Sequence, residues 1–214
     1  MCSNQNDRKE NTRNPRFTID RVNGFSDGVL AIVITILVLG IDIPMDHDFS
    51  DAGLRSFFHK LEFSLLAYVI SFSLGVVYWM QHYFMFHFIK HSSNKLIWLN
   101  ALFLLAITLL PFVSKVKTLY EFDFHAVLIY SIVQFSISGS LLIPWHYIIK
   151  HIELQSEPFP PHVVKNFTML LLVMPLVCIL AVGISIFNVH IGTLVFLLIP
   201  IINVLFYWQR KIYL

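Results

Sequence analysis

Long runs of apolar residues, separated by short polar segments, recur along the whole chain. A helix that crosses a bilayer needs about 20 mostly apolar residues, because each residue adds about 1.5 Å and the hydrocarbon layer is about 30 Å thick. Six runs reach or approach this length, and they cover residues 22–41, 63–89, 96–116, 126–149, 163–187 and 191–208. The pattern predicts an all-α polytopic membrane protein with six transmembrane helices.

Proline residues fall both between and within the predicted spans. Pro44 follows the first span, and further prolines occupy the longest of the later connections, where they end helices: Pro158, Pro160 and Pro161. A proline inside a span removes a backbone donor, but neighbouring helices can satisfy the freed carbonyl groups. We therefore expect kinks, and no breaks, at four positions within the spans: Pro111, Pro144, Pro175 and Pro200.

The composition places most side chains against lipid or other protein. Apolar and aromatic residues make up 57% of the 214 residues and charged residues only 13%, and the mean hydropathy is +0.70, which is unlike a soluble domain. Residues 1–21 are predicted to form a cytoplasmic N-terminal tail, and residues 22–211 the six-helix transmembrane domain. Cys2 and Cys178 lie in different environments and are interpreted as free thiols.

The basic residues predict the orientation in the membrane, because cytoplasmic loops carry an excess of Lys and Arg. They are not gathered into a stripe, and the net charge is only +2, so no nucleic-acid partner is expected. If the N-terminus is cytoplasmic, eleven basic residues lie inside and four outside, which predicts that both termini are cytoplasmic. The inner set is Arg8, Lys9, Arg13, Arg16, Arg21, Lys90, Lys95, Lys150, Lys165, Arg210 and Lys211, and the outer set is Arg55, Lys60, Lys115 and Lys117.

Polar residues inside the spans are the candidates for function. The first span opens with Arg21 and Asp27, and ionisable groups there are costly unless they find partners. On a helix these two point to different sides, so each is expected to reach another helix. The candidate partners are His82, Trp98 and Asn100. A purely structural role for His82 and Asn100, as interhelical hydrogen bonds of about 0.6 kcal/mol each, largely coincides with this interpretation.

These residues belong to a motif that resembles a known family. The run Arg21-Val-Asn-Gly-Phe25-Ser26-Asp27, with the apolar run that follows it to Leu39, resembles the signature first helix of the transmembrane protein 175 potassium channel family. Three later segments resemble the next elements of that family in the same order: Trp79-x-x-His82, Leu96-Ile-Trp98-Leu-Asn100 and Leu109-Leu-Pro111-Phe112. The resemblance covers roughly the first half of the chain. The last three spans match only in hydrophobicity and length.

The resemblance implies a potassium-permeable channel of the single-repeat prokaryotic type. It implies that four copies form a homotetramer in a bacterial plasma membrane, and that the first helices line a central pore. It also implies that the motif residues and their partners form one interhelical network, comprising Arg21, Phe25, Ser26, Asp27, His82, Trp98 and Asn100. Tyr83 stands where a histidine is often found in the family.

One apolar stripe of the first span is the candidate pore lining. Relative to Ile32, an ideal helix places Ile36 at about 40° and Leu39 at about −20°, with Thr35 about 60° to the side. Periodicity alone favours lipid contact or packing for such a stripe. With the resemblance, four copies are expected to stack apolar rings that gate by dewetting and select modestly, because potassium sheds water more readily than sodium.

Two other classes of protein remain open at this point. A small secondary transporter of a cation or small solute uses polar or interrupted helices at mid-membrane, and the prolines within the spans are compatible with that. A membrane enzyme needs clustered catalytic residues in the spans, and these are scarce. His87 and His91 share a helical face without an evident third ligand, so neither a cofactor nor a metal other than permeating potassium is expected. Gly24 and Gly28 are spaced for a close helix approach.

Overall fold

The computed structural model describes residues 18–41 and 51–209, and these residues contain six helices or helical segments of membrane-spanning length. The segments cover residues 19–40, 61–87, 94–119, 124–150, 161–185 and 189–206. The prediction of an all-helical protein with six spans is confirmed, and each predicted end lies within three residues of these bounds. The expectations for the tail up to Arg16, for Cys2 and Pro44, and for Arg210 and Lys211 lie outside the described residues.

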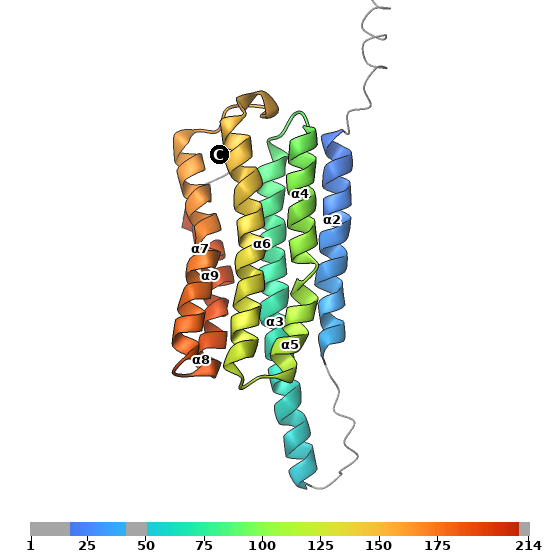
Figure 1. Cartoon of the computed structure of the whole chain (residues 1–214), viewed down its shortest axis with the longest axis vertical. Coiled ribbons are helices and arrows are strands. Elements are labelled where there is room, and N and C mark those ends of the chain that lie inside the picture. The colour runs from blue at the N-terminus through green and yellow to red at the C-terminus, as the bar shows by residue number, and fades with distance from the viewer. Residues whose placement is uncertain (1–17, 42–50, 210–214) are drawn as a thin grey trace, which may run out of the picture.

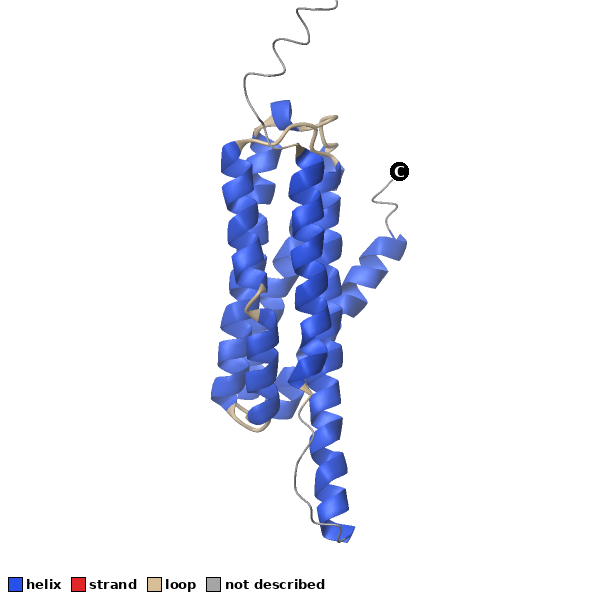
Figure 2. Cartoon of the chain, turned by 90° about the vertical axis from the view of Figure 1, so that its right-hand side faces the viewer, coloured by secondary structure: helices blue, strands red, loops and turns tan. Residues whose placement is uncertain are grey.

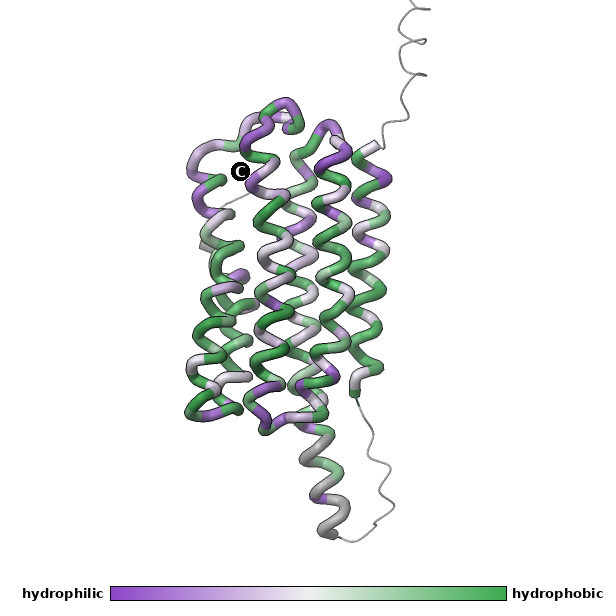
Figure 3. The backbone as a smooth tube through the Cα atoms, in the orientation of Figure 1, coloured by the Kyte–Doolittle hydropathy of each residue, from purple (hydrophilic) through white to green (hydrophobic). Residues whose placement is uncertain are grey.

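The helices form an up-and-down bundle in which neighbours in sequence run in opposite directions (Figure 1). The first five spans comprise α2 (Ile19–Ile36), α3 (Asp51–His87), α4 (Asn94–Ile107) with α5 (Leu110–Leu119), α6 (Phe124–Lys150) and α7 (Pro161–Ser185). The sixth contains α8 (Val189–Leu194) and α9 (Leu198–Gln209), and α9 leans away from the bundle in the view of Figure 2. Apolar residues fill the middle of the bundle and polar residues gather at its ends (Figure 3), as a bilayer requires.

Prolines divide two of the six spans. Pro111 has no N–H to donate to the carbonyl of Ile107, and α4 ends at Ile107. The amide of Leu109 instead donates to the carbonyl of Ala106, three residues earlier, at 3.2 Å. The expectation of a kink without a break is therefore wrong at this position. Pro200 lies in the first turn of α9, directly after a 3₁₀ turn, Val195–Leu197. The two remaining prolines lie within continuous helices, as expected: Pro144 in α6 and Pro175 in α7.

The second span extends well beyond its apolar run. α3 begins at Asp51, twelve residues before the predicted start at residue 63. The added turns contain charged residues, including Arg55 and Glu62, so hydropathy does not reveal them, although backbone hydrogen bonds continue the helix. In Figure 1 this extension projects beyond the end of the bundle.

Side-chain caps start three of the helices. The backbone amide of Leu96 donates to Ser93 before α4 at 3.2 Å, that of His125 to Asp123 before α6 at 2.7 Å, and that of Ile191 to Asn188 before α8 at 3.1 Å. Each cap satisfies an amide that the first turn of a helix leaves without a carbonyl partner. These polar residues therefore fix where the later spans begin.

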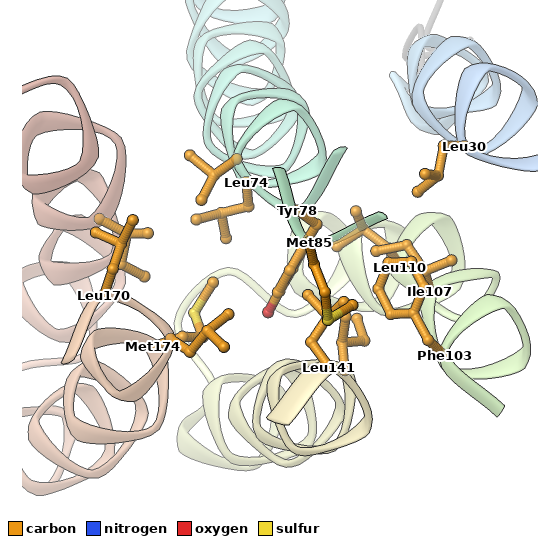
Figure 4. Packing of buried hydrophobic residues seen from close by; sticks show 14 of the residues in the cluster. Leu30, Leu74, Tyr78, Met85, Phe103, Ile107, Leu110, Leu141, Leu170 and Met174 are labelled. Atoms are coloured by element: carbon orange, nitrogen blue, oxygen red, sulfur yellow. The ribbon is translucent and has the colours of Figure 1, made fainter. Parts of the chain in front are cut away.

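The interior is packed with large apolar side chains from every span. Figure 4 shows Leu30 of α2 near Phe103 and Ile107 of α4, while Leu74 and Tyr78 of α3 face Leu141 and Met174. α3 approaches α2 closely at Gly75, where an added Cβ would lie 2.9 Å from a side-chain carbon of Ile34. The first span is thus packed on the second through direct contact, and this contact defines its position in the bundle.

Candidate functional site

The first span, formed by α2 and the 3₁₀ turn Leu37–Gly40, has one buried and one exposed face. The buried face recurs every three or four residues, as one side of a helix must. It consists of Val22, Ser26, Leu30, Val33 and Leu37. Four of these five side chains are apolar, and Ser26 is the exception that connects α2 to the polar interior.

A chain of buried polar groups joins α2 to α4 and α3. The Ser26 hydroxyl donates to the carbonyl of Val22 at 2.8 Å and accepts a hydrogen bond from the Asn100 amide at 2.8 Å. The Asn100 carbonyl oxygen lies 2.9 Å from Nε2 of His82, so this nitrogen carries the proton in a neutral ring. Ser26, Asn100 and His82 are each at most 3% exposed. They form the polar anchor, the name used below for these three residues.

Two aromatic rings hold the imidazole of His82 in place. The ring centroids of Phe86 and Phe103 lie 4.3 and 5.4 Å from that of His82, and each plane is tilted by only 16°. The imidazole is therefore stacked between α3 and α4 and cannot rotate freely. Neither phenylalanine was identified from the sequence, although Phe86 lies four residues after His82, on the same face of the helix.

Asp27 is held by a second contact at the edge of the anchor. Its carboxylate accepts a hydrogen bond from the indole N–H of Trp79 at 3.1 Å. Trp79 is three residues before His82, so the two lie on one face of α3. Trp79 binds Asp27 directly, and His82 is linked to Ser26 through Asn100. Beside these contacts lies an open hollow of about 210 Å³ whose lining includes Asp20, Asn23 and His87.

Three other residues predicted for the network lie outside the anchor. Phe25 is 66% exposed and Trp98 is 77% exposed. Arg21 is exposed as well, and within the described part of the chain its guanidinium forms no ion pair with Asp27 or with another carboxylate. The structure thus brings together Ser26, Asn100 and His82, and it leaves Arg21, Phe25 and Trp98 on the surface of the subunit.

The exposed face of α2 carries the predicted apolar stripe. Ile32, Ile36 and Leu39 are 58%, 43% and 72% exposed, although each is fully apolar. Leu39 lies in the 3₁₀ turn, which has three residues per turn, so it stands almost directly over Ile36 and the stripe is straighter than an ideal α-helix predicts. The Thr35 hydroxyl donates to its own helix at Ala31 and Ile32, at 2.9 and 3.0 Å. Its lone pairs remain available to accept.

No group of three His, Cys, Asp or Glu side chains that could hold a metal ion occurs in the part of the chain that the structure describes. Cys178 is a buried free thiol. The polar groups of the site are thus suited to fixing a helix in place, and the exposed stripe is suited to contact with an apolar or weakly hydrated partner.

The architecture defines the class first: a polytopic α-helical membrane protein whose first helix is fastened by polar contacts to the next two spans. Comparison with known proteins then shows which family this part of the chain is similar to. The model of the family described as endosomal/lysosomal potassium channel TMEM175 matches residues 21–111, which contain the stripe and the whole polar anchor. Residues 21–111 are thus similar to the TMEM175 family.

Two curated relatives show the same extent of similarity. The chain is 35% identical over 100 residues to a potassium channel of Chamaesiphon minutus, and the match covers 47% of this chain and 49% of that one. It is 34% identical over 98 residues to a potassium channel of a Chryseobacterium species, covering 46% and 48%. The matched segment thus spans about half the length of the curated relatives it matches.

Solved structures extend the similarity of the fold to most of the chain. A crystal structure described as a lysosomal potassium-selective channel TMEM175 homolog from Chamaesiphon minutus superposes with a TM-score of 0.75 and 26% identity, covering 87% of this chain and 96% of that chain. A variant of the potassium channel MtTMEM175 superposes with a TM-score of 0.55 and 18% identity, covering 92% and 96%. The second likeness concerns the fold alone.

Proposed function

We propose that this chain is a subunit of a potassium-permeable channel that conducts cations passively and uses α2 as its pore-lining helix. The observation that carries the proposal is the division of α2 into two faces. One face is fixed to α3 and α4 by the polar anchor, and the other presents Ile32, Ile36 and Leu39 outward. The relatives that match this half of the chain are named potassium channels.

We infer further that four copies assemble with their α2 helices around one axis. The exposed apolar face of α2 can contact either lipid or another subunit. Gly24 and Gly28 favour another subunit, because an added Cβ at either position would meet no atom within 4 Å and this side of α2 is therefore open. Small residues let helices of different subunits approach closely in a membrane. In such a tetramer the exposed stripe supplies three successive apolar rings.

The proposed rings act as a gate and as a modest selectivity filter. A narrow apolar constriction expels water and blocks ions, and a wider one admits the cation that gives up part of its hydration at least cost. The Thr35 lone pairs, which point away from the donated hydrogen bond, would accept from water or contact a partly dehydrated cation. The polar anchor keeps α2 at a fixed distance from the axis and takes no part in the passage itself.

The proposed setting is a bacterial plasma membrane with both termini in the cytoplasm. Among the described basic residues, Lys90, Lys95, Lys150 and Lys165 lie in or beside the connections at one end of the bundle. The backbone hydrogen bonds from Lys90 to Leu154 and from Ser156 to Phe88, each 2.8 Å long, hold two of these connections together. This basic end is the cytoplasmic one under the positive-inside rule.

Flux through liposomes containing the purified protein tests the proposal. We expect an electrogenic potassium flux that Ile32→Asn and Leu39→Asn change at least about tenfold, because a polar ring stays wet where an apolar ring dewets. Ile179→Asn is the matched control, since Ile179 is 65% exposed and its helix, α7, lies at the opposite edge of the bundle from α2 (Figure 1). Equal flux in all three variants would disprove the pore assignment. Saturable coupled exchange in place of electrogenic flux would identify a secondary transporter.

A further inference from the structure

Lys117 is a buried cation that the proposed pore does not use. It lies on α5, two residues before the helix ends at Leu119, and only 7% of it is exposed. Its ammonium group donates to the backbone carbonyl of Glu121 at 2.7 Å. An ammonium has three N–H donors, and within the described residues no carboxylate pairs with this one. The carboxylates of Glu121 and Asp123 attract the ammonium, but neither forms an ion pair with it among the described residues. A buried charge is costly unless its donors are satisfied, so the remaining N–H groups call for a partner.

The inner neighbours of Lys117 already satisfy one another. Ser71 donates to Ser114 at 2.9 Å and lies 3.0 Å from the Tyr130 hydroxyl. The hydroxyls of Ser71 and Tyr130 border a narrow space next to Lys117 with room for about 10 Å³, which does not exceed the volume of one water. A partner for the ammonium group must therefore come from the other side.

On that side lies a larger hollow between α3, α5 and α8. It has a volume of about 120 Å³, roughly ten times what one water needs. Its lining includes Phe63, Leu66, Lys117, Glu121, His190 and Thr193. The hollow thus combines apolar walls with two groups of opposite charge.

The Lys117 ammonium and the Glu121 carboxylate do not bind each other. Lys117 binds the backbone carbonyl of Glu121, and the two side chains attract each other without forming an ion pair among the described residues. The hydroxyls of Thr118 and Thr193 donate to their own helices at 3.1 and 2.9 Å, so they do not supply donors to the hollow. What the lining offers to a ligand is one cation, one carboxylate and the imidazole of His190.

The hollow lies at the level of lipid headgroups. The third span ends at residue 119, the second begins at residue 61 and the sixth begins at residue 189, and all three ends border it. The His190 ring packs against Phe63 and Phe122, with centroids 5.3 and 4.7 Å apart, as aromatic residues do at membrane interfaces. A lipid can reach this place from the bilayer with its acyl chains against the apolar walls.

We propose that the hollow binds the zwitterionic headgroup of a phosphatidylethanolamine-type lipid. Its phosphate accepts hydrogen bonds from the Lys117 ammonium, and its primary ammonium pairs with the Glu121 carboxylate. Charge-assisted hydrogen bonds of this kind are stronger than those between neutral groups. The site is separate from the α2 stripe and does not depend on what the protein conducts.

The test is the thermal unfolding midpoint of the purified full-length protein in detergent, titrated with short-chain phosphatidylethanolamine, phosphatidylglycerol or phosphatidylcholine. We expect phosphatidylethanolamine to raise the midpoint with an affinity about tenfold or more above that of the other two, or about 1.4 kcal/mol. Lys117→Met should weaken phosphatidylethanolamine and phosphatidylglycerol alike, and Glu121→Gln should remove the preference between them. Lys115→Met, an exposed lysine on the same helix, should behave as the wild type.

Three results would overturn the proposal. The first is an unchanged response to phosphatidylethanolamine in Lys117→Met. The second is an equal shift with soluble O-phosphoethanolamine, which would assign the hollow to a free headgroup and not to a lipid. The third applies if Lys117→Met fails to fold: Thr193→Leu fills the hollow from α8 and leaves both charges in place, so a wild-type lipid response in that variant contradicts binding there.

Discussion

The helices α2 and α6 are both apolar membrane spans, yet they are built into the subunit in different ways. In the most apolar 18-residue stretch of α6, 50% of the residues are buried. In the corresponding stretch of the first span, only 28% of the residues are buried. α6 lies in the middle of the bundle, with α4 and α5 on one side and α7 on the other (Figure 1). α2 lies at its edge and is held by a narrow buried face and the polar anchor. The comparison separates a helix that is packed on two sides from a helix whose second face stays exposed.

The kinds of contact differ as well. α6 packs Trp145 against the rings of Phe159 and Phe167, and its indole N–H donates to Thr168 at 2.8 Å. α2 depends on short polar links, which are directional and fix its rotation as well as its distance. The rotation of α2 about its own axis decides which side chains are exposed, because a rotation of about 100° brings a neighbouring residue to the place of the first. This explains why a buried serine is found in an otherwise apolar interface.

The largest expected effect tests α6 as the scaffold. Trp145→Ala should lower the free energy of unfolding by about 3–5 kcal/mol, because it empties a fully packed position and removes the hydrogen bond to Thr168. The measurement is denaturant unfolding in detergent. Ile143→Ala on the same helix is the control, since Ile143 is exposed and should change stability by no more than about 0.5 kcal/mol. Similar losses in both variants would remove the distinction between the faces of α6.

The next test compares the two faces of α2. Leu30→Ala should cost about 2–5 kcal/mol of stability, because Leu30 is completely buried. Ile32→Ala should change stability by no more than about 0.5 kcal/mol and should instead alter the potassium flux in liposomes. If Ile32→Ala destabilised the isolated subunit as much as Leu30→Ala, the outward face of α2 would have to be packed within the subunit.

The polar anchor should have a smaller and coupled effect. Asn100→Leu removes the partner of both Ser26 and His82, and leaving such groups unpaired costs about 1–3 kcal/mol. Ser26→Ala should cost less, and the double variant should show a coupling of about 0.6 kcal/mol. Unfolding of the two single variants and the double variant measures this. Strict additivity would mean that the 2.8 Å contact does not stabilise the attachment of α2.

The smallest expected effect lies outside the membrane, at the start of α6. Asp123 accepts hydrogen bonds from the backbone amide and the ring of His125, and these lower the pKa of its carboxyl group. A lowered folded-state pKa stabilises the protein above the ordinary value of about 4, and this contribution is lost as the pH falls through the lower, folded-state value. Asp123→Asn keeps a capping side chain and should flatten the fall of stability below about pH 4. An unchanged pH profile would show that the cap is not coupled to folding.

Much of the fold follows from the sequence. The length of the apolar runs gives six spans because a bilayer of fixed thickness selects helices of fixed length. The motif from Arg21 to Asp27 and the residues His82 and Asn100 also carry the resemblance to the TMEM175 family before any contact is known, and the family model matches the segment that contains them. The charged start of α3 was not predictable from hydropathy, because a helix that leaves the membrane no longer needs apolar side chains. The break before Pro111 was not predicted either. The sequence does not show whether a neighbouring helix supplies a hydrogen-bond donor to the carbonyl of Ile107, which Pro111 cannot bind.

For the site, the sequence by itself determined which residues are chemically able to connect helices, and which positions of α2 share a side. Only the tertiary structure decided which of them meet: Asn100 reaches Ser26 and His82, whereas Trp98, two residues earlier, points outward. The same holds for Lys117, which reads as an outer loop cation in the sequence and is buried beside a hollow in the fold. The physical reason is that helical periodicity fixes directions within one helix, whereas contacts between helices depend on how each is rotated and placed against its neighbours.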